Sequence, residues 1–240
     1  MRPPSTLSLA ALCAGLVATP SAAQDVFKLD ELVFSASLTD VARDRTGVRV
    51  SRITARDLAN GGRLQFSEFL ETLAGVNVTQ SGPIGTSATL RIRGLDSKYI
   101  PVRINGIDVT DPSSTQTQFD FGKLTSSGIA SAEVLYGSQS AILGSGAIGG
   151  AVNITTVDAP DEIGSEIGYN LEVGSFETMR TGLTYGTRFE RGFLAVSLSN
   201  TNTEGYSAAD ENAGNAEADG FESIDLSLRG EYQATDTLTF

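Results

Sequence analysis

The C-terminal third of the sequence alternates between apolar and polar residues with a period of two. Apolar residues occupy every second position in four segments, at Ile167, Tyr169, Leu171 and Val173, at Leu183 and Tyr185, at Leu194, Val196 and Leu198, and at Ile224, Leu226 and Leu228. This period is that of a β-strand with one apolar and one polar face. Strands of about ten residues with this pattern are typical of transmembrane β-barrels, whose two faces contact lipid and lumen. A soluble β-sandwich has the same alternation.

The connections between these segments favour the barrel. The turn at 189–193 is short, whereas 205–221 is long, polar and acidic, and outer-membrane barrels have short periplasmic turns and longer outside loops. We therefore expect Phe189 and Phe193 in the inner aromatic girdle, and Tyr206 or Phe221 near the outer one. Four or five strands cannot close a barrel, since the smallest single-chain barrels have about eight. The sequence looks truncated; alternatively, several chains contribute strands to one shared barrel.

Before these strands the pattern is mixed. Phe66, Phe69, Leu70 and Leu73 form one apolar stripe at helical spacing, ended by Gly75, and Thr54-Ala55-Arg56-Asp57 has the spacing of a capping box. Asn105-Gly106 between two apolar runs predicts a hairpin. We expect a mixed α/β domain at 47–156, a linker at 157–163, and the first four to five strands of an incomplete antiparallel barrel at 164–240.

Glycines cluster at 133–156, and Gly144-Ser145-Gly146-Ala147-Ile148-Gly149 matches the dinucleotide-binding pattern G-x-G-x-x-G. That fingerprint requires a helix directly after the glycines, so that the helix N-terminus holds a pyrophosphate. Here a β-branched, alternating run follows instead. The segment therefore predicts a strand, a tightly folded crossing and a second strand.

The amino-acid composition disfavours several classes of function. The formal net charge is -12, there is no histidine, and the single cysteine is Cys13, which disfavours nucleic-acid binding, most catalytic triads and Cys/His zinc sites. We expect neither an enzyme nor a cofactor. Arg2, an apolar run at 7–17 and a small-residue end predict a signal peptide at 1–23.

Three glycine-containing motifs resemble the plug domain of TonB-dependent outer-membrane receptors. They lie at 133–154, at Leu90-Arg91-Ile92-Arg93-Gly94 and at Ile104-Asn105-Gly106-Ile107. One departure stands out: the family usually has arginine and proline where this chain has Tyr136 and Ser138. Within the family, the sequence looks most like the cobalamin receptor branch, with ferric siderophore receptors next.

The resemblance implies site residues. The region 24–46 would hold a TonB box, an extended heptad suited to pairing with a partner's sheet edge. The apolar residues of this heptad are also compatible with a first plug strand. The heptad is Asp30, Glu31, Leu32, Val33, Phe34, Ser35 and Ala36. Two loops would bind ligand, through Gln80, Ser81, Gly82, Pro83, Ile84 and Gly85 and through Asp111, Ser113, Gln116, Gln118 and Phe121. Arg91 and Arg93 would join plug to barrel through acids such as Glu166 or Glu172.

The resulting hypothesis is active import of a scarce ligand, cobalamin or an iron chelate, across a Gram-negative outer membrane. Its partners would be outer-membrane lipid and a TonB-type energy-transducing complex of the inner membrane. The alternatives are a soluble periplasmic β-rich binding or scaffold module and a non-functional receptor fragment. The acidic loop at 205–221 also suggests a calcium site, but it lacks EF-hand spacing, and solvated charge on an outside loop is the favoured interpretation.

Overall fold

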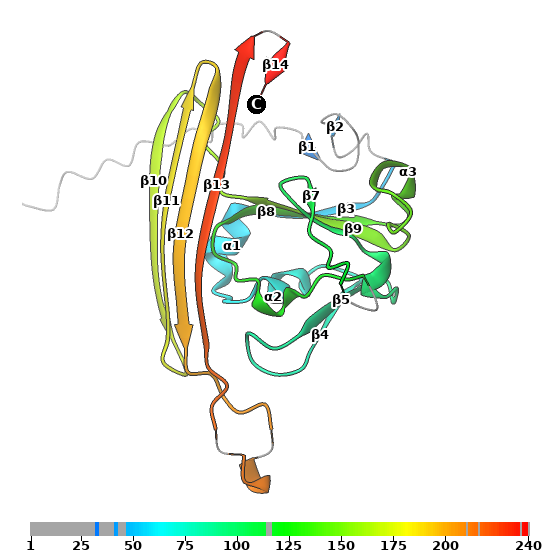
Figure 1. The fold of residues 1–240 in the computed structure, drawn as a ribbon, viewed down its shortest axis with the longest axis vertical. Helices are drawn as coiled ribbons and strands as arrows, with labels where there is room; N and C mark the ends of the chain where they lie inside the picture. Colours follow the sequence, from blue (N-terminus) through cyan, green and yellow to red (C-terminus); the bar gives the residue numbers. More distant parts are fainter. Residues whose placement is uncertain are drawn as a thin grey trace, which may run out of the picture. The chain divides into compact units, whose positions relative to one another are not determined.

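The computed structural model describes residues 32–33, 41–42, 47–113, 117–209, 211–215, 217–235 and 237–239 (Figure 1). The predicted signal peptide at 1–23 lies outside these residues. Within the described residues, no helix has the length and apolar character needed to cross a membrane.

The α/β domain, residues 47–156, contains a mixed sheet and a separate hairpin. The sheet has the order β3-β8-β9-β6-β7 and is antiparallel except for the parallel β6–β9 pair, and β4 pairs with β5. The elements are β3 (Val50–Ile53), α1 (Ala55–Gly61), α2 (Phe66–Leu70), β4 (Val76–Gln80), β5 (Ala88–Ile92), η2 (Ser97–Tyr99), β6 (Val102–Ile104), β7 (Ile107–Asp108), η3 (Phe121–Lys123), β8 (Ile129–Tyr136), α3 (Ser140–Leu143) and β9 (Gly150–Thr156).

Local sequence signals account for several of these elements. Thr54 and Asp57 form the predicted capping box of α1, and Asn105 and Gly106 both have positive φ, as a tight hairpin turn between β6 and β7 requires. The glycine-rich crossing leads into strand β9, not into a helix, as predicted. Helix α2 is shorter than its stripe predicts: it ends at Leu70, and Leu73 packs on the core from a following turn.

The main core lies between one face of this sheet, the helices and the β4–β5 hairpin. Phe66, Leu70 and Val134 are among its fully buried side chains. Each such apolar side chain contributes about 1.5–3 kcal/mol on burial. A smaller cluster of Val50, Leu135 and Ala151 covers the opposite face.

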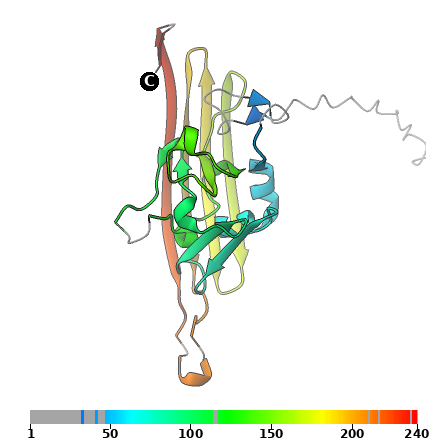
Figure 2. The ribbon, with the colours of Figure 1, turned by 90° about the vertical axis from the view of Figure 1, so that its right-hand side faces the viewer.

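The C-terminal sheet consists of β10 (Gly164–Gly174), β11 (Thr178–Phe189), β12 (Gly192–Thr203), β13 (Phe221–Thr235) and β14 (Leu238–Thr239), in sequence order and antiparallel. The short 3-10 turn η4 (Glu211–Ala213) lies in the β12–β13 loop. The long strands lie side by side behind the α/β domain (Figure 2). The sheet is open, since β10 and β14 each have one neighbour.

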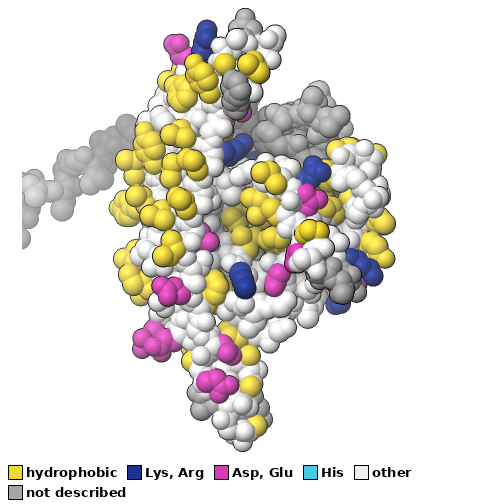
Figure 3. Space-filling model, viewed as in Figure 1, with side chains coloured by type: hydrophobic (Ala, Val, Ile, Leu, Met, Phe, Trp, Pro, Cys, Tyr) yellow, Lys and Arg dark blue, Asp and Glu magenta, His cyan; other side chains and the backbone are white. Residues whose placement is uncertain are grey.

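The two faces of the C-terminal sheet differ as the alternation predicts. The outer face carries exposed large apolar side chains, among them Tyr169 at 89% and Leu226 at 72% exposure, and Figure 3 shows hydrophobic side chains gathered over these strands. The inner face carries buried Ser197, Ser199 and Thr201 and contacts the α/β domain. Both parts belong to one unit, Leu32–Phe240.

One expectation about this sheet is wrong. Phe193 does not share the outer face with Phe189: it is buried at 8% exposure, with the guanidinium groups of Arg188 and Arg229 at 5.3 and 5.2 Å from its ring centroid. The register pairs Phe189 with Gly192 and Arg188 with Phe193. Because neighbouring strand positions face opposite sides, the two-residue turn places Phe193 inward.

Candidate functional site

The two loops expected to bind ligand meet at the end of the β4–β5 hairpin. The amide of Gly85 donates a hydrogen bond to the carbonyl oxygen of Gly122, 2.9 Å away. The Asp120 carboxylate accepts from the amides of Ala88 and Gly122, at 2.8 and 2.9 Å. A Cβ atom at Gly122 would lie 1.8 Å from the Thr86 carbonyl oxygen, so this approach requires glycine. The structure therefore joins the first loop to the C-terminal end of the second.

Gln80 closes the first loop on itself. Its side-chain amide donates to the carbonyl oxygen of Pro83 at 2.9 Å, and the Ser81 amide donates to the Ser87 carbonyl at 3.1 Å. Ser81 is exposed and Pro83 is buried, while Gln80, Gly82, Ile84 and Gly85 are half-buried. The loop thus has a fixed backbone with an exposed tip.

The second loop is held by its own polar residues. Asp111 accepts from the amide and hydroxyl of Ser113 at 2.8 and 2.7 Å. Asp111 also forms a backbone bridge with Gln118, whose side-chain oxygen accepts from the Ser97 hydroxyl at 2.7 Å. The two bonds from Ser113 hold the pKa of Asp111 below its ordinary value. Gln116 lies outside the described residues.

Phe121 is a correction to the predicted ligand contacts. Its side chain is only 1% exposed and belongs to the main core of the α/β domain, with the ring edge-to-face against Phe119 at 4.8 Å. The Asp120 carboxylate caps the 3-10 turn η3, which begins at Phe121. That turn directs the aromatic ring inward, so Phe121 supports the second loop from beneath.

The long β12–β13 loop lies against the first ligand loop. A Cβ at Gly82 would be 2.8 Å from the Ala208 Cβ, and one at Gly85 would be 2.8 Å from a ring carbon of Phe221. Phe221 therefore faces inward at the start of β13, not toward an outer girdle. The predicted ligand surface is thus bordered by the C-terminal sheet as well as by the α/β domain.

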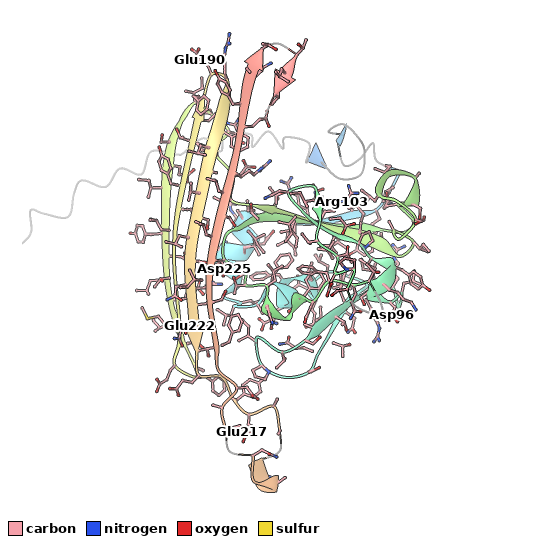
Figure 4. All side chains as sticks on the ribbon, viewed as in Figure 1. Asp96, Arg103, Glu190, Glu217, Glu222 and Asp225 are labelled. Atoms are coloured by element: carbon pink, nitrogen blue, oxygen red, sulfur yellow. The ribbon has the colours of Figure 1, made fainter. Side chains whose placement is uncertain are left out.

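The acidic side chains that the structure describes in this long loop do not form a metal site. In the parts of the chain that the structure describes, no group of three or more His, Cys, Asp or Glu side chains could hold a metal ion. Figure 4 shows Glu217 far out on the loop and Glu222 at the start of β13. Asp219 accepts from the Ala208 amide at 2.7 Å and so fixes the loop backbone.

Arg180 is a buried polar contact between the C-terminal sheet and the α/β domain, and sequence reasoning missed it. Its side chain is buried, pairs with Glu172 and donates to the Ser126 hydroxyl, with the Arg63 carbonyl oxygen at 3.4 Å. Glu172 and Arg180 are directly opposite each other in register. An arginine at an inward position opposite a glutamate is the signal that could have identified the pair.

A second contact lies nearby on β13. The Thr125 hydroxyl donates to Asp225 at 3.2 Å, and Ser223 donates to the same carboxylate at 3.2 Å. The Gln65 side chain donates to the Gly122 carbonyl at 3.1 Å and so ties the segment before Thr125 to the start of α2. Residues 124–128 are therefore a docking strip between α2 and the C-terminal sheet.

The predicted arginines have different neighbours. Arg91 pairs with Asp96 at 3.2 Å, and Figure 4 shows Asp96 on the side of the α/β domain away from the C-terminal sheet. The Arg93 guanidinium lies 5.0 Å from the ring centroid of Tyr136. Glu172 forms its ion pair with Arg180. Glu166 lines a cavity of about 280 Å³ between the α/β domain and β10–β11. Contacts from Arg91 or Arg93 to a barrel wall remain a prediction.

The segment that connects the α/β domain to the C-terminal sheet is also held in place by contacts. Arg229 pairs with Asp158 at 2.7 Å, and Arg188 donates to the Pro160 carbonyl oxygen. A Cβ at Gly186 would lie 3.0 Å from the Asp158 carbonyl oxygen. The segment between β9 and β10 therefore packs on the inner face of the C-terminal sheet.

Only part of the predicted TonB box is described. Leu32 and Val33 form β1 (Leu32–Val33), which pairs antiparallel with β2 (Val41–Ala42). The other five members, Asp30, Glu31, Phe34, Ser35 and Ala36, lie outside the described residues. Its assignment stays a prediction.

Comparison with known proteins gives consistent matches. Residues 42–151 match the family model of the TonB-dependent Receptor Plug Domain. The vitamin B12 transporter BtuB of Photobacterium profundum is 29% identical over 189 residues, 79% of this chain and 30% of that protein. The siderophore receptor PirA of Acinetobacter baumannii has a TM-score of 0.59 at 26% identity, over 79% of this chain and 30% of that chain.

A further structure supports the fold alone: the FrpB iron transporter of Neisseria meningitidis has a TM-score of 0.63 at 17% identity, over 79% of this chain and 29% of that one. These matches confirm the predicted resemblance to TonB-dependent receptors. They also confirm the fold class, a mixed α/β plug domain followed by strands of an incomplete antiparallel β-barrel. The chain spans about a third of the length of the relatives it matches.

Proposed function

We propose that this chain forms part of a TonB-dependent importer that carries a scarce small molecule across an outer membrane. The observation that carries the proposal is the docking of a plug-type α/β domain on the inner, hydroxyl-rich face of a sheet whose outer face is apolar. An apolar outer face and a polar inner face are what lipid and lumen require. The partners would be outer-membrane lipid and a TonB-type complex of the inner membrane.

The ligand surface would be the one formed by residues 80–85, the second loop at 111–120 and the adjoining β12–β13 loop. Two features support it: the Gly85–Gly122 bond fixes the first loop to the residues that follow the second loop, and Ser81 and Asp111 are exposed. The likeness to vitamin B12 transporters makes a corrinoid the first candidate, and the likeness to siderophore receptors makes a ferric chelate the second.

Energy would come from the partner through residues 30–36. An extended segment that adds a strand to a partner's sheet depends on backbone hydrogen bonds. Proline removes one such donor and alanine does not, so Val33→Pro and Val33→Ala form a matched pair.

The test measures uptake of labelled cyanocobalamin and of a labelled ferric siderophore by cells that produce the protein in its native form. We expect uptake of one of them, loss of that uptake with Val33→Pro, and retention with Val33→Ala. Binding to isolated outer membranes should survive both changes. Uptake that is insensitive to Val33→Pro would contradict the mechanism. Recovery of the protein in the soluble periplasmic fraction would favour a soluble module instead.

A further inference from the structure

Tyr136, at the end of β8, contacts two arginines that come from different parts of the α/β domain. Its side chain is 4% exposed. The guanidinium carbon of Arg49 lies 5.3 Å from the ring centroid, and that of Arg93 lies 5.0 Å from it. A cation near an aromatic ring at this distance is attracted by the electron density of the ring face. The ring therefore binds both segments at once.

The first segment is the entrance of the chain into the α/β domain. The Tyr136 amide donates to the Arg49 carbonyl oxygen at 3.0 Å, and the Tyr136 hydroxyl donates to the Ser51 hydroxyl oxygen at 3.2 Å. The register continues with Val50 opposite Leu135. Within its sheet β3 pairs only with β8, so it is an edge strand, and Tyr136 holds the end of it that lies toward the N-terminus.

The second segment is the end of the β4–β5 hairpin. The Arg93 amide donates to the Gly75 carbonyl oxygen at 2.7 Å, and both residues have positive φ, 51° and 82°. A Cβ at Gly75 would lie 3.5 Å from Arg93 and 3.9 Å from the Tyr136 ring. This tight closure fixes the direction in which the Arg93 side chain leaves the hairpin.

The same hairpin carries the proposed ligand loop at its other end. Its register runs without a break from Val76 opposite Ile92 to Gln80 opposite Ala88, and Gln80 begins the loop that meets Gly122. Hydrogen bonds join β4 and β5 along this whole register, so the two ends of the hairpin belong to one continuous ladder.

We propose that Tyr136 is a positioning residue that couples the N-terminal strand β3 to the ligand-loop hairpin β4–β5. Displacement of residues 47–53 breaks the contacts of Arg49 and Ser51 with Tyr136, which frees the ring and with it Arg93. Conversely, a ligand that contacts residues 80–85 and holds the hairpin in place strengthens the attachment of β3. This inference rests on the proposed function, since it assigns the coupling to the two ends of the importer that must communicate.

Hydrogen exchange measured by mass spectrometry on the full protein in outer-membrane preparations tests the coupling. Arg93→Met is the informative variant, because Arg93 contacts the ring and is not part of β3. We expect exchange of residues 50–53 to rise by roughly tenfold. Arg91→Met is the matched control, since Arg91 pairs with Asp96; it should leave residues 50–53 unchanged.

Substitutions of the tyrosine itself separate coupling from simple core packing. Tyr136→Phe keeps the ring and loses only the bond to Ser51, so exchange at 50–53 and at 81–87 should stay within about twofold of the wild type. Tyr136→Leu keeps apolar volume without the ring and should raise exchange at both ends. If Arg93→Met alters exchange only around its own turn, Tyr136 is a core residue and the coupling is wrong.

Uptake is measured separately, so the two proposals fail in distinguishable ways. Exchange that follows these expectations in a protein that imports nothing would leave the coupling intact and overturn the importer. Import by the wild type, together with unchanged exchange at 50–53 in Arg93→Met, would overturn the coupling alone.

Discussion

The amide of Gly85 and the carbonyl oxygen of Gly122 are 2.9 Å apart, and this hydrogen bond joins two loops that are distant in sequence. Gly122 sits so close to the Thr86 carbonyl that no larger residue fits. The proposed ligand surface therefore depends on a backbone approach, and on the side chains of Asp120 and Gln65 that hold Gly122 in place.

Gly122→Ala is expected to separate the two loops. The added methyl group would lie 1.8 Å from the Thr86 carbonyl oxygen, so the backbone must shift; such overpacking costs about 1–3 kcal/mol. Ligand affinity should fall, and exchange of the Gly85 amide should accelerate. Gly146→Ala is the control, because nothing lies within 4 Å of its Cβ position. Equal ligand affinity in the two variants would show that the loops do not act together.

Arg180→Met is expected to loosen the docking strip at 124–128. The change removes the buried partner of Glu172 and the donor to Ser126. Glu172 remains 41% exposed and so partly solvated; we therefore expect a cost of about 1–3 kcal/mol, below that of breaking a fully buried pair. The measurement is exchange at 124–128, with Arg191→Met in the exposed β11–β12 turn as control.

The double variant Arg180→Met/Glu172→Gln sharpens this test. If the two side chains act as a pair, the combined loss should be smaller than the sum of the single losses. Additive losses would instead mean that Arg180 acts through Ser126 and Arg63 alone.

Sequence patterns correctly predicted those helices and strands that depend on residues close together in the sequence. The alternation around Leu226 predicted a strand because one face contacts the α/β domain and the other does not, and Thr54 and Asp57 predicted the start of α1 because both capping partners lie within four residues. The resemblance predicted the plug, and its motifs lie at the end of β5, at the β6–β7 turn, and from β8 through α3 into β9.

Contacts between distant segments were not predictable in the same way. The partner of Arg93 depends on the angle at which the β4–β5 hairpin packs on the sheet, and that angle brings it to Tyr136. The inward orientation of Phe193, by contrast, follows from the alternation itself, because Phe193 directly precedes the outward-facing Leu194 and neighbouring strand positions face opposite sides. Phe121 looked like a loop residue because its 3-10 turn has no periodic signal.

The capping box makes α1 sensitive to acid. The Thr54 backbone amide and hydroxyl both donate to Asp57, at 2.8 and 2.7 Å, and these bonds lower the Asp57 pKa. A carboxylate with a lowered folded-state pKa stabilises above its unfolded pKa and loses that contribution as pH falls through the folded value. Asp57→Asn should cost about 1 kcal/mol at pH 7, and the difference should shrink in acid below the ordinary aspartate pKa.

Glu68→Gln should have the opposite effect on stability at neutral pH, in the same region of the α/β domain. Burial raises the Glu68 pKa, so its charged form opposes folding at neutral pH and protonation relieves that cost. The variant should be more protected from exchange at pH 7, and the gain should fade as pH falls. A change of the same sign in both variants at pH 7 would mean that at least one carboxyl does not behave as its contacts indicate.

The outer face of the C-terminal sheet gives the most direct test of membrane placement. Leu226 lies in the middle of β13 and is 72% exposed, and its neighbours across the sheet include Leu198. If this face contacts lipid, Leu226→Arg should cost about 2–4 kcal/mol, the value for arginine near the bilayer midplane. Tyr232→Arg, near the end of the same strand, should cost less because that position is closer to the interface. The measurement is the fraction of each full-length variant that reaches the outer membrane. In a soluble protein Leu226 would be an ordinary exposed residue, so equal recovery of both variants and the wild type would overturn the assignment of this face to lipid.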